Sequence, residues 1–379
     1  MTEPFEKKTF FALSLDPVHV GTGGYRLGHV DSTILRESGT QLPKIPGSSL
    51  NGVTRAYTAM AVQTQAEDCH GAVFKDNGDQ LWKLDCSIYH KMTYLRPVYI
   101  RVKGESDDQE IATLCSGTDG NPLIQVEEDT GKQIYHSCAG KGGVQGEQHC
   151  GRSDCPVCVA FGFSKGDGGG FQGLVQFFDL QILFFPVYSS LGPVWVTSPG
   201  ILRQFDVDLT EKDLEPEEFW TKLTVPDSRI FIGGYEYKEK TAAEDVFNDG
   251  LVSVPRKIRE RALIFDDVTF GRIVNDNLEV RTSVSINPET GAAEDGALFT
   301  YEAIPRATVM WFDVVYNRPE FFRIGGEKIS LTINDIQMNV QKGLALLESL
   351  GIGGMNTRGM GRVRVLNLDE MVQEQNNGS

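Results

Sequence analysis

The sequence predicts an α+β fold with an RRM-like or ferredoxin-like core assembled from the two ends of the chain. Near the N-terminus, KKTFFALSLD alternates in apolar character as a strand does, and a helix signal follows after a long loop. Near the C-terminus, a helical stripe in residues 333–352 precedes a glycine-rich loop and a second alternating strand, RVRVLNL. Two pieces of this kind, similar in length, are what a split β-α-β core requires.

Both predicted helices carry start signals and an apolar stripe. The first, in IPGSSLNGVTRAYTAMAVQ, opens with Pro46, Gly47 and two serines able to cap backbone N–H groups. The second has Asn334 or Asp335 as its candidate cap. The stripes are Leu50, Val53, Tyr57 and Met60 in the first helix and Ile336, Val340, Leu344 and Leu347 in the second.

Two further apolar strands, QFFDLQILFF and TVMWFDVVY, are predicted between the core halves. The stretches around them are poorer in periodicity and richer in Gly, Asp and Glu, and we interpret these as insertions. The predicted organisation is 1–63 and 320–367 for the core halves, 64–175 for an insertion with a four-cysteine motif, 176–205 and 262–319 for core strands and elaborations, 206–261 for a second insertion, and 368–379 for a flexible tail.

Composition and charge narrow the function classes. The chain has 379 residues, of which 40% are hydrophobic, enough for about two domains with a substantial core. The N-terminus has no apolar signal region, and ILFFPVY is too short to cross a bilayer, so we expect a cytoplasmic protein. A net charge of −16 argues against a polyanion partner, but the charge is segregated: PRKIRER and NTRGMGRVR are basic, whereas EKDLEPEE is acidic. Each run alone also fits a solvated surface.

Four of the seven cysteines form a cluster with metal-ligand spacing. Cys138, Cys150, Cys155 and Cys158 read C-x11-C-x4-C-x2-C, and two thiolates separated by two residues can bind one ion in a tight turn. Four such ligands complete the tetrahedron of a structural Zn²⁺ site, which would hold together a loop with little apolar core. His136 or His149 can replace one cysteine. The competing interpretation is a set of buried free thiols in a glycine-rich loop.

A nucleotide-binding enzyme is a poor fit to the glycine-rich segments. GSSLNGVT has the glycine spacing of a phosphate loop, but Val53 stands where its lysine must be. GTGGYR has Arg26 where the dinucleotide-binding fingerprint needs its last glycine. These segments therefore need another explanation.

Ordered motifs along nearly the whole chain supply that explanation. They are HVGTGG with an Asp in the following loop, RESGTQLPKIPGSSLNGVTR, CPVCVAFG, DLQILFFPVYS, GPVWVTSPGILRQF, EVRTSVSINPETGAAEDGALFTYEAIP and GGMNTRGMGRV. Together they closely resemble the RAMP-superfamily backbone subunit of type III-B (Cmr) CRISPR effector complexes.

The resemblance implies two RNA-contacting segments. The turn that begins the first helix is expected to face guide-RNA phosphates with its backbone N–H groups and helix dipole. Family members often carry Lys where this chain has Asn51, so Lys44 or Arg55 is expected to supply the charge. The terminal glycine-rich loop lets the main chain approach phosphates, and the competing interpretation is a flexible connector. The expected RNA-binding residues are Lys44, Gly47, Ser48, Ser49, Asn51, Arg55, Gly353, Gly354, Arg358, Gly359 and Arg362.

The resemblance also implies a catalytic site that cuts target RNA with Mg²⁺ or Mn²⁺. Asp31 matches the family's catalytic Asp, and either accepts the 2′-OH proton or holds the metal. His19 and Glu302 match positions near the same site, as acid or phosphate-stabilising group and as metal or orienting group. The competing interpretations are an Asp that caps its own turn, a structural His and a rim Glu.

Implied partners are guide crRNA, target RNA, copies of this chain stacked head to tail, and other Cmr subunits, without a membrane. A thumb-like element is expected to wedge into the guide, with residues 206–261 as its candidate. Two alternatives stay open: a non-catalytic RNA-binding scaffold, and the backbone subunit of a related type III-A or III-D complex.

Overall fold

The computed structural model describes most of the chain outside the segment 65–152. The described residues are 3–22, 30–64, 138, 149, 151, 153–164, 169–207, 214–240, 251–287 and 289–368, together with the backbone of six short strands between 73 and 135. Within these residues, no helix combines the length and the apolar character needed to cross a bilayer.

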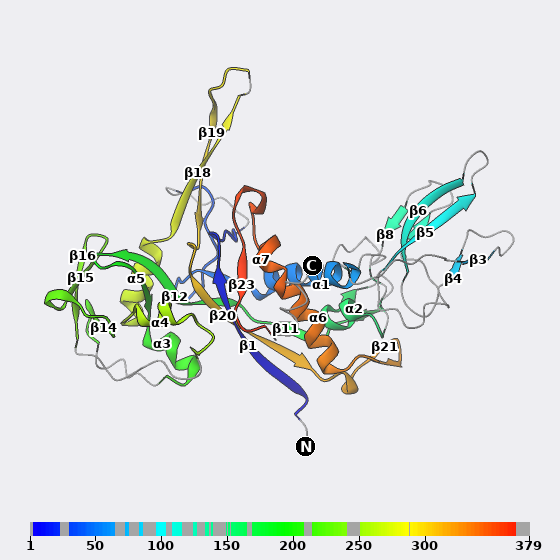
Figure 1. Ribbon diagram of the computed structural model, residues 1–379, viewed down its shortest axis with the longest axis horizontal. Helices are drawn as coiled ribbons and strands as arrows, with labels where there is room; N and C mark the ends of the chain where they lie inside the picture. The colour runs from blue at the N-terminus through cyan, green and yellow to red at the C-terminus, as the bar shows by residue number, and fades with distance from the viewer. Residues whose placement is uncertain are drawn as a thin grey trace.

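A large sheet runs through the middle of the molecule (Figure 1). Strand β1 (Phe5–Ser14) lies next to the edge strand and pairs antiparallel with β20 (Val309–Asn317) on one side and with the edge strand β23 (Val363–Val365) on the other. The next strand, β12 (Leu180–Ser189), pairs antiparallel with β20. Both faces of β1 are covered, because Phe10 packs into one hydrophobic cluster and Phe11 into another.

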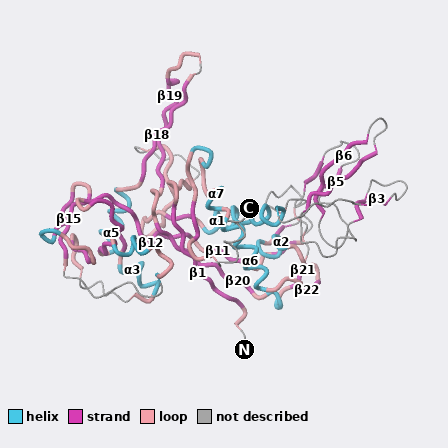
Figure 2. The backbone as a smooth tube through the Cα atoms, in the orientation of Figure 1, coloured by secondary structure: helices cyan, strands magenta, loops and turns pink. Residues whose placement is uncertain are grey.

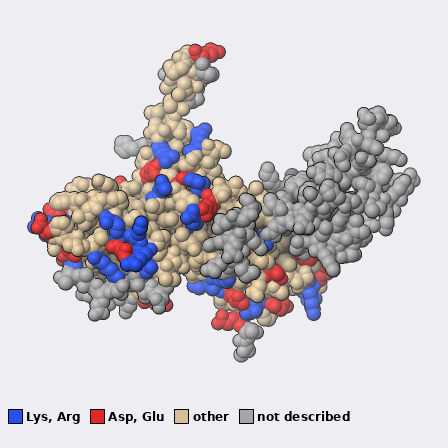
Figure 3. Space-filling model, in the orientation of Figure 1, with Lys and Arg blue, Asp and Glu red and all other residues tan. Residues whose placement is uncertain are grey.

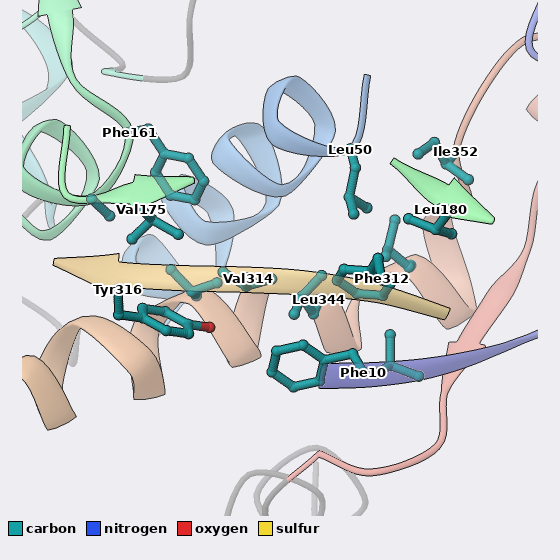
Figure 4. Packing of buried hydrophobic residues seen from close by; sticks show 14 of the residues in the cluster. Phe10, Leu50, Phe161, Val175, Leu180, Phe312, Val314, Tyr316, Leu344 and Ile352 are labelled. Carbon is teal, nitrogen blue, oxygen red and sulfur yellow. The ribbon is translucent and has the colours of Figure 1, made fainter. Parts of the chain in front are cut away.

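Two helices cover one face of this part of the sheet. They are α1 (Gly47–Thr64) and α6 (Ile333–Ala345), and the chain order is β1, α1, β12, β20, α6, β23. Leu50 from α1 and Leu344 from α6 lie in the same cluster as Phe10 and Phe312, whose rings stack at 5.4 Å between centroids (Figure 4). The predicted apolar stripes of both helices therefore point toward the sheet, except that Met60 is exposed.

The N-terminus of α6 corrects one detail of the sequence analysis. The cap is Thr332, which accepts a hydrogen bond from the backbone N of Asp335 while the Asp335 carboxylate accepts one from the backbone N of Thr332. Asp335 is thus the third helical residue of a capping box. The sequence analysis therefore recognised a capping residue in this segment but placed the cap at Asn334 or Asp335, two or three residues after the observed cap.

The other half of the sheet closes into a ring of six strands, called the strand ring here. Its order is β12, β13 (Gly192–Thr197), β17 (Ala262–Phe265), β14 (Glu218–Thr221), β16 (Tyr235–Glu239) and β15 (Arg229–Ile232), which returns to β12. Inward side chains, including Phe185, Phe219 and Tyr237, form its core.

The strand ring changes the interpretation of residues 206–261. The sequence analysis made this range a thumb candidate, but its described parts supply β14, β15, β16 and α4 (Arg256–Glu260) to the ring and its surroundings. Its acidic and polar residues hid strands whose alternate side chains are buried, such as Ile230 and Ile232. The hairpin of β18 (Glu279–Ile286) and β19 (Ala293–Ala303), by contrast, projects from the body (Figures 1 and 2).

The remaining elements are short. They are β2 (Lys44–Ile45), β3 (Val73–Lys75), β4 (Lys83–Asp85), β5 (Arg96–Lys103), β6 (Asp108–Cys115), β7 (Ile124–Val126), β8 (Gln133–Tyr135), α2 (Pro156–Phe161), β9 (Phe163–Ser164), β10 (Gly170–Phe171), β11 (Val175–Phe177), α3 (Pro199–Leu202), η3 (Arg203–Phe205), η5 (Pro226–Ser228), α5 (Asp267–Asp276), η7 (Pro319–Phe321), β21 (Arg323–Ile324), β22 (Glu327–Lys328), α7 (Leu347–Leu350) and η8 (Asn356–Arg358).

Candidate functional site

Asp31 lies at the base of the projecting hairpin, where the loop after β1 runs beside β19. Its Oδ2 accepts a hydrogen bond from the Thr300 backbone N at 2.7 Å and another from the Thr300 hydroxyl at 3.1 Å. The next residue continues the attachment, since Ser32 N donates to Thr300 O and Ser32 O accepts from Glu302 N. Asp31 is exposed. Its carboxylate is therefore held by a distant strand and faces outward, rather than capping its own turn.

His19 lies on the inner side of the same region. Only 6% of its surface is exposed, and its Nδ1 is 2.6 Å from the backbone carbonyl of Glu302. A carbonyl oxygen can only accept, so Nδ1 carries the proton, and in the neutral ring Nε2 is the acceptor. Nε2 is 3.3 Å from the hydroxyl of Ser32, and the edge of the ring meets Tyr301.

Glu302 turns its carboxylate away from the two residues above. Both oxygens lie 3.0 Å from the Arg36 guanidinium, and Oε2 also accepts from the backbone N of Ile34 at 3.3 Å. Both side chains of this ion pair are mostly buried. The structure thus brings the three predicted catalytic residues to one segment of β19, residues 300–302, but it uses the Glu302 carboxylate to fix the loop beside Asp31.

The terminal glycine-rich loop, residues 351–361, passes over His19. Gly354 N donates to the His19 carbonyl at 2.8 Å, and a side chain on Gly353 would overlap that same carbonyl. Gly353 also has a φ of +90°, which residues with a Cβ rarely adopt. The loop therefore packs directly on the backbone of the candidate site.

Two arginines of this segment differ in their surroundings. Arg358 is exposed at the end of η8. Arg362 makes a two-pronged ion pair with Asp16, and the hydrogen bond from this guanidinium holds the pKa of Asp16 below its ordinary value. Gly359 is exposed beside Arg358. Of these two arginines, Arg362 is paired with Asp16, whereas Arg358 is exposed and does not share that ion pair.

The turn that begins α1 already binds a carboxylate of the protein itself, that of Asp179. Asp179 Oδ1 accepts from the backbone N of Gly47 at 2.8 Å, and Oδ2 is 2.6 Å from Lys44 Nζ. Burial alone would raise the pKa of Asp179, but the hydrogen bonds from Lys44 and Gly47 outweigh it and keep the pKa below its ordinary value. The same contact raises the pKa of Lys44. Of the predicted RNA-binding residues here, Ser48 is exposed and Ser49 and Asn51 are half-buried.

Arg55 points from α1 into the cysteine-containing segment. Its guanidinium donates to the carbonyls of Cys138 and Gly162, each at 2.8 Å, and lies 3.1 Å from Nδ1 of His149. The predicted RNA contact at Arg55 therefore competes with three internal contacts. Its observed role is to join α1 to the segment that follows Cys138.

Three cysteines form a buried cluster behind this guanidinium. The Sγ atoms of Cys138, Cys155 and Cys158 lie within 4.8 Å of one another, and the Cys158 backbone N donates to the sulfur of Cys155 at 3.4 Å. Three convergent thiols are a donor set that suits Zn²⁺. Cys150 and His136, two of the candidate fourth ligands, lie outside the described residues. His149 is described and is not a member of the cluster.

The hairpin carries an exposed apolar face that the sequence analysis did not use. Val280, Val284 and Ile286 of β18 are 54%, 45% and 60% exposed, and Leu298 of β19 is 64% exposed. By the pairing of the strands, they share one face with Thr300, the partner of Asp31. The alternation in EVRTSVSI was the available signal, because its apolar residues Val280, Val284 and Ile286 all fall on one set of alternate positions, with Thr282 between them.

Charged side chains are distributed unevenly over the surface. Figure 3 shows Lys and Arg gathered near α4 on the strand ring and again at the base of the hairpin. The basic run 255–261 forms α4, where Arg256 is 83% exposed by side chain and pairs with Glu260. The net negative charge of the chain thus leaves local basic surfaces intact.

Comparisons with known proteins identify the family. The family model described as the RAMP superfamily matches residues 13–364. The chain is 30% identical over 161 residues to the CRISPR system Cmr endoribonuclease Cmr4 of Pyrococcus furiosus; the match covers 37% of this chain and 54% of that protein, so the chain spans about half the length of this curated relative.

Solved structures share the fold. A chain of the type III-B Cmr-beta complex in the apo state matches with a TM-score of 0.52 and 12% identity, covering 95% of this chain and 96% of the other. A chain of Cmr-beta bound to cognate target RNA matches with a TM-score of 0.51 and 12% identity, covering 96% and 98%. At this identity, the likeness concerns the fold. The resemblance expected from the sequence motifs is confirmed.

Proposed function

The chain belongs to the RAMP superfamily, and from that premise we propose that it is a guide-RNA-binding backbone subunit of a type III-B CRISPR effector complex that cleaves complementary target RNA at regular intervals. The partial match to an endoribonuclease, Cmr4, supports the activity, and the fold shared with Cmr-beta chains supports the assembly. Guide crRNA, target RNA, further copies of this chain and other subunits are its proposed partners.

One observation carries the catalytic part of this proposal. Asp31 is an exposed carboxylate fixed by two hydrogen bonds from Thr300, at the foot of a hairpin whose apolar face is open to solvent. A fixed, exposed acid beside a buried histidine is an arrangement suited to proton transfer on a bound strand. The site is also bordered by the glycine-rich loop, through Gly354 and His19.

The proposed chemistry is attack of a ribose 2′-OH on the adjacent phosphate, for which the nucleotide must be held in line. Asp31 orients the ribose or accepts its proton. Glu302 fixes the loop through Arg36. Mg²⁺ is commonly bound by one or two carboxylates together with phosphate oxygens, so Asp31 with bound RNA is a donor set that fits a divalent ion, which would supply charge stabilisation at the phosphate.

The hairpin of β18 and β19 is the proposed thumb, in place of residues 206–261. It projects from the body, and its exposed apolar side chains Val280, Val284 and Leu298 lie on the face that leads to Thr300 and Asp31. Apolar wedges of this kind separate stacked bases at a cost of a few kcal/mol per step. A base displaced there would distort the backbone next to the carboxylate.

The phosphate contacts are proposed at the exposed parts of the two glycine-rich segments. In the terminal loop these are the exposed residues Gly353, Gly354, Arg358 and Gly359, of which the first two lie next to His19. At the start of α1 they are Ser48, Ser49 and Asn51. Lys44, Gly47, Arg55 and Arg362 contribute less, because each already has an internal acceptor.

The β1, α1, β12, β20, α6, β23 half is the proposed RRM-like core. Its sheet order is β12, β20, β1, β23, and all these pairs are antiparallel. A split β-α-β pair gives this arrangement, with each crossing helix on the same face. The two ends of the chain thus build one RNA-binding platform.

The cysteine cluster is the proposed structural Zn²⁺ site, with Cys138, Cys155 and Cys158 as three ligands. Arg55 faces Nδ1 of His149, which favours Cys150 or His136 over His149 as the fourth ligand. Metal analysis of the purified protein tests this, with one zinc per chain expected and none in Cys158→Ser. A full zinc content in that variant would contradict the assignment.

A cleavage assay of the assembled complex on matched RNA tests the function. Asp31→Ala is expected to leave assembly and target binding intact and to lower the cleavage rate at least about 100-fold, the lower range for loss of an acid–base group. Asp276→Ala, at the exposed end of α5, is the matched control. Cutting at the normal spacing by Asp31→Ala would overturn the assignment.

The alternative function is a scaffold that binds RNA without cutting it. It is favoured by one observation, the pairing of Glu302 with Arg36, which removes the second carboxylate from the site. The same assay separates the two. If wild-type complexes bind matched RNA in the presence of Mg²⁺ or Mn²⁺ and leave it intact, the scaffold is the function.

A further inference from the structure

The environment of His19 fixes which ring nitrogen can accept a proton. Nδ1 donates to the Glu302 carbonyl at 2.6 Å, so Nε2 is the free acceptor of the neutral ring. Only 6% of the surface of His19 is exposed, so a proton from bound RNA would have to reach its ring through a neighbouring group. The neighbour at Nε2 is the hydroxyl of Ser32, 3.3 Å away.

Ser32 connects this buried nitrogen to the exposed carboxylate. It follows Asp31 directly, is half-buried, and is held on β19 by hydrogen bonds on both sides of its peptide unit. Its hydroxyl therefore lies beside the buried ring, on the residue next to the exposed Asp31. A serine hydroxyl donates one hydrogen bond while accepting another, which is the property a relay needs.

Gly21 leaves room beside both groups. A Cβ at this position would lie 3.1 Å from His19 Nε2 and 3.6 Å from Ser32 Oγ. Gly21 is itself exposed and its φ is outside the left-handed region, so backbone conformation does not require glycine here. A methyl group at Gly21 would therefore press on the contact between Ser32 and His19.

We propose that Ser32 and His19 form a proton relay that accepts the proton of the attacking 2′-OH; this rests on the cleavage activity proposed above. As the bond between O2′ and phosphorus forms, the 2′-OH proton passes to Ser32 Oγ, and the Ser32 proton passes to His19 Nε2. The bond between phosphorus and O5′ breaks, and O5′ takes a proton from water. Asp31 then acts as the orienting or metal-binding group beside the relay.

Other ionisable groups lie on the elements that pack against His19. Among the described residues they include Asp16, Asp31, Arg36 and Glu37 in the loop after β1, Tyr301 and Glu302 on β19, and Arg358 in the glycine-rich loop. Arg36 and Glu302 are paired with each other. A pH readout must therefore be compared between variants that leave these groups unchanged.

Three variants in the assembled complex test the relay. Ser32→Ala should lower the rate of target cleavage about 100-fold and change how that rate depends on pH. Ser32→Thr restores a hydroxyl and should recover most of the rate. Gly21→Ala places a methyl group against Nε2 and should lower the rate about 10-fold, since small misplacements at a reacting group are costly.

Binding and control measurements keep the outcome clear. Affinity for a target with 2′-deoxy sugars at the cut sites should be unchanged in all three variants, and Gly39→Ala, where a Cβ meets nothing within 4 Å, should cut like wild type. If wild type cuts but Ser32→Ala cuts equally fast with an unchanged pH profile, the relay is wrong and the proposed function stands. If wild-type complexes do not cut, the proposed function itself fails.

Discussion

The two glycine-rich segments of this protein look alike in sequence and differ in what surrounds them. Residues 46–52 begin α1, and residues 351–361 connect α7 to β23. In the first segment, Gly47 is enclosed by the backbone of Phe177 and its N–H is bound by Asp179. In the second, Gly353 lies against His19, and both Gly353 and Gly354 are exposed.

The difference shows that glycine spacing identifies a close approach of two backbones without identifying the partner. At Gly47 the partner is the Phe177 carbonyl, so the approach serves packing. At Gly353 the partner is the carbonyl of a candidate catalytic histidine. Both glycines are needed for the same steric reason, but only the second is expected to act on cleavage directly.

The largest expected effect comes from placing the same methyl group in both segments. Gly353→Ala should lower target cleavage more than about 100-fold, because displacement of His19 by even 1 Å is costly at a reacting site. Gly47→Ala should instead lower the free energy of unfolding by about 1–3 kcal/mol, because the added methyl group overpacks the site, and so lower the midpoint of thermal unfolding. The cleavage rate per folded complex should be unchanged. Cleavage assays and thermal melts of the two variants provide the measurement.

Gly359→Ala controls for backbone strain in that comparison. Gly359 has a φ of +76° but no atom within 4 Å of an added Cβ. It should therefore show the strain of a left-handed residue, about 1–2 kcal/mol, and a smaller loss of cleavage than Gly353→Ala. Equal loss of cleavage in Gly359→Ala and Gly353→Ala would show that loop strain, rather than the contact with His19, sets the effect.

A smaller effect is expected on guide affinity. Arg358→Gln removes an exposed cation and should weaken binding about tenfold at low salt and reduce the slope of affinity against salt by about 1. Lys44→Gln removes a cation already paired with Asp179 and should change affinity less than about threefold. Titration of the two variants with guide RNA at several salt concentrations makes the measurement. A steeper loss for Lys44→Gln would mean that the Asp179 pair opens when RNA binds.

The smallest expected effect concerns the pH dependence of stability at the α1 segment. The pKa of Asp179 is lowered in the folded protein, so its stabilising contribution is present above the ordinary value of 3.8 and is lost as the pH falls through the folded-state value. Asp179→Asn should lower the free energy of unfolding by about 1 kcal/mol near pH 7, as loss of a helix cap does, and by less at pH 3. Unfolding at both pH values checks this, and a loss that is larger at pH 3 would contradict it.

Local patterns predicted many individual elements. The alternation of β1, the stripes of α1 and α6 and the strand character of β12 and β20 appear where the sequence indicated, because side-chain periodicity depends only on neighbouring residues. The strand ring was missed, since its strands are short and rich in polar outward residues, as in RIFI and YEYKE. Because the described parts of residues 206–261 belong to this ring and its surroundings, we propose the hairpin of β18 and β19 as the thumb instead.

The candidate site divides in the same way. The sequence indicated Asp31, His19 and Glu302 through family motifs, and the cysteine spacing indicated a metal site. Ser32 and Thr300 were missed, because a serine or threonine in a strand or loop carries no signal of its own. Their importance appears only when the hydroxyl is seen at Nε2 of His19 and at the carboxylate of Asp31.

By itself, the sequence determined the secondary structure of the central sheet, the cysteine spacing and the superfamily. The tertiary structure decided which polar groups are already bound and which are open. Asp179 lies 132 residues from Gly47 in the chain, and Thr300 lies 269 residues from Asp31. The physical reason is that a hydrogen bond between distant segments depends on how the strands are arranged in space, and periodicity within a segment carries no information about that arrangement.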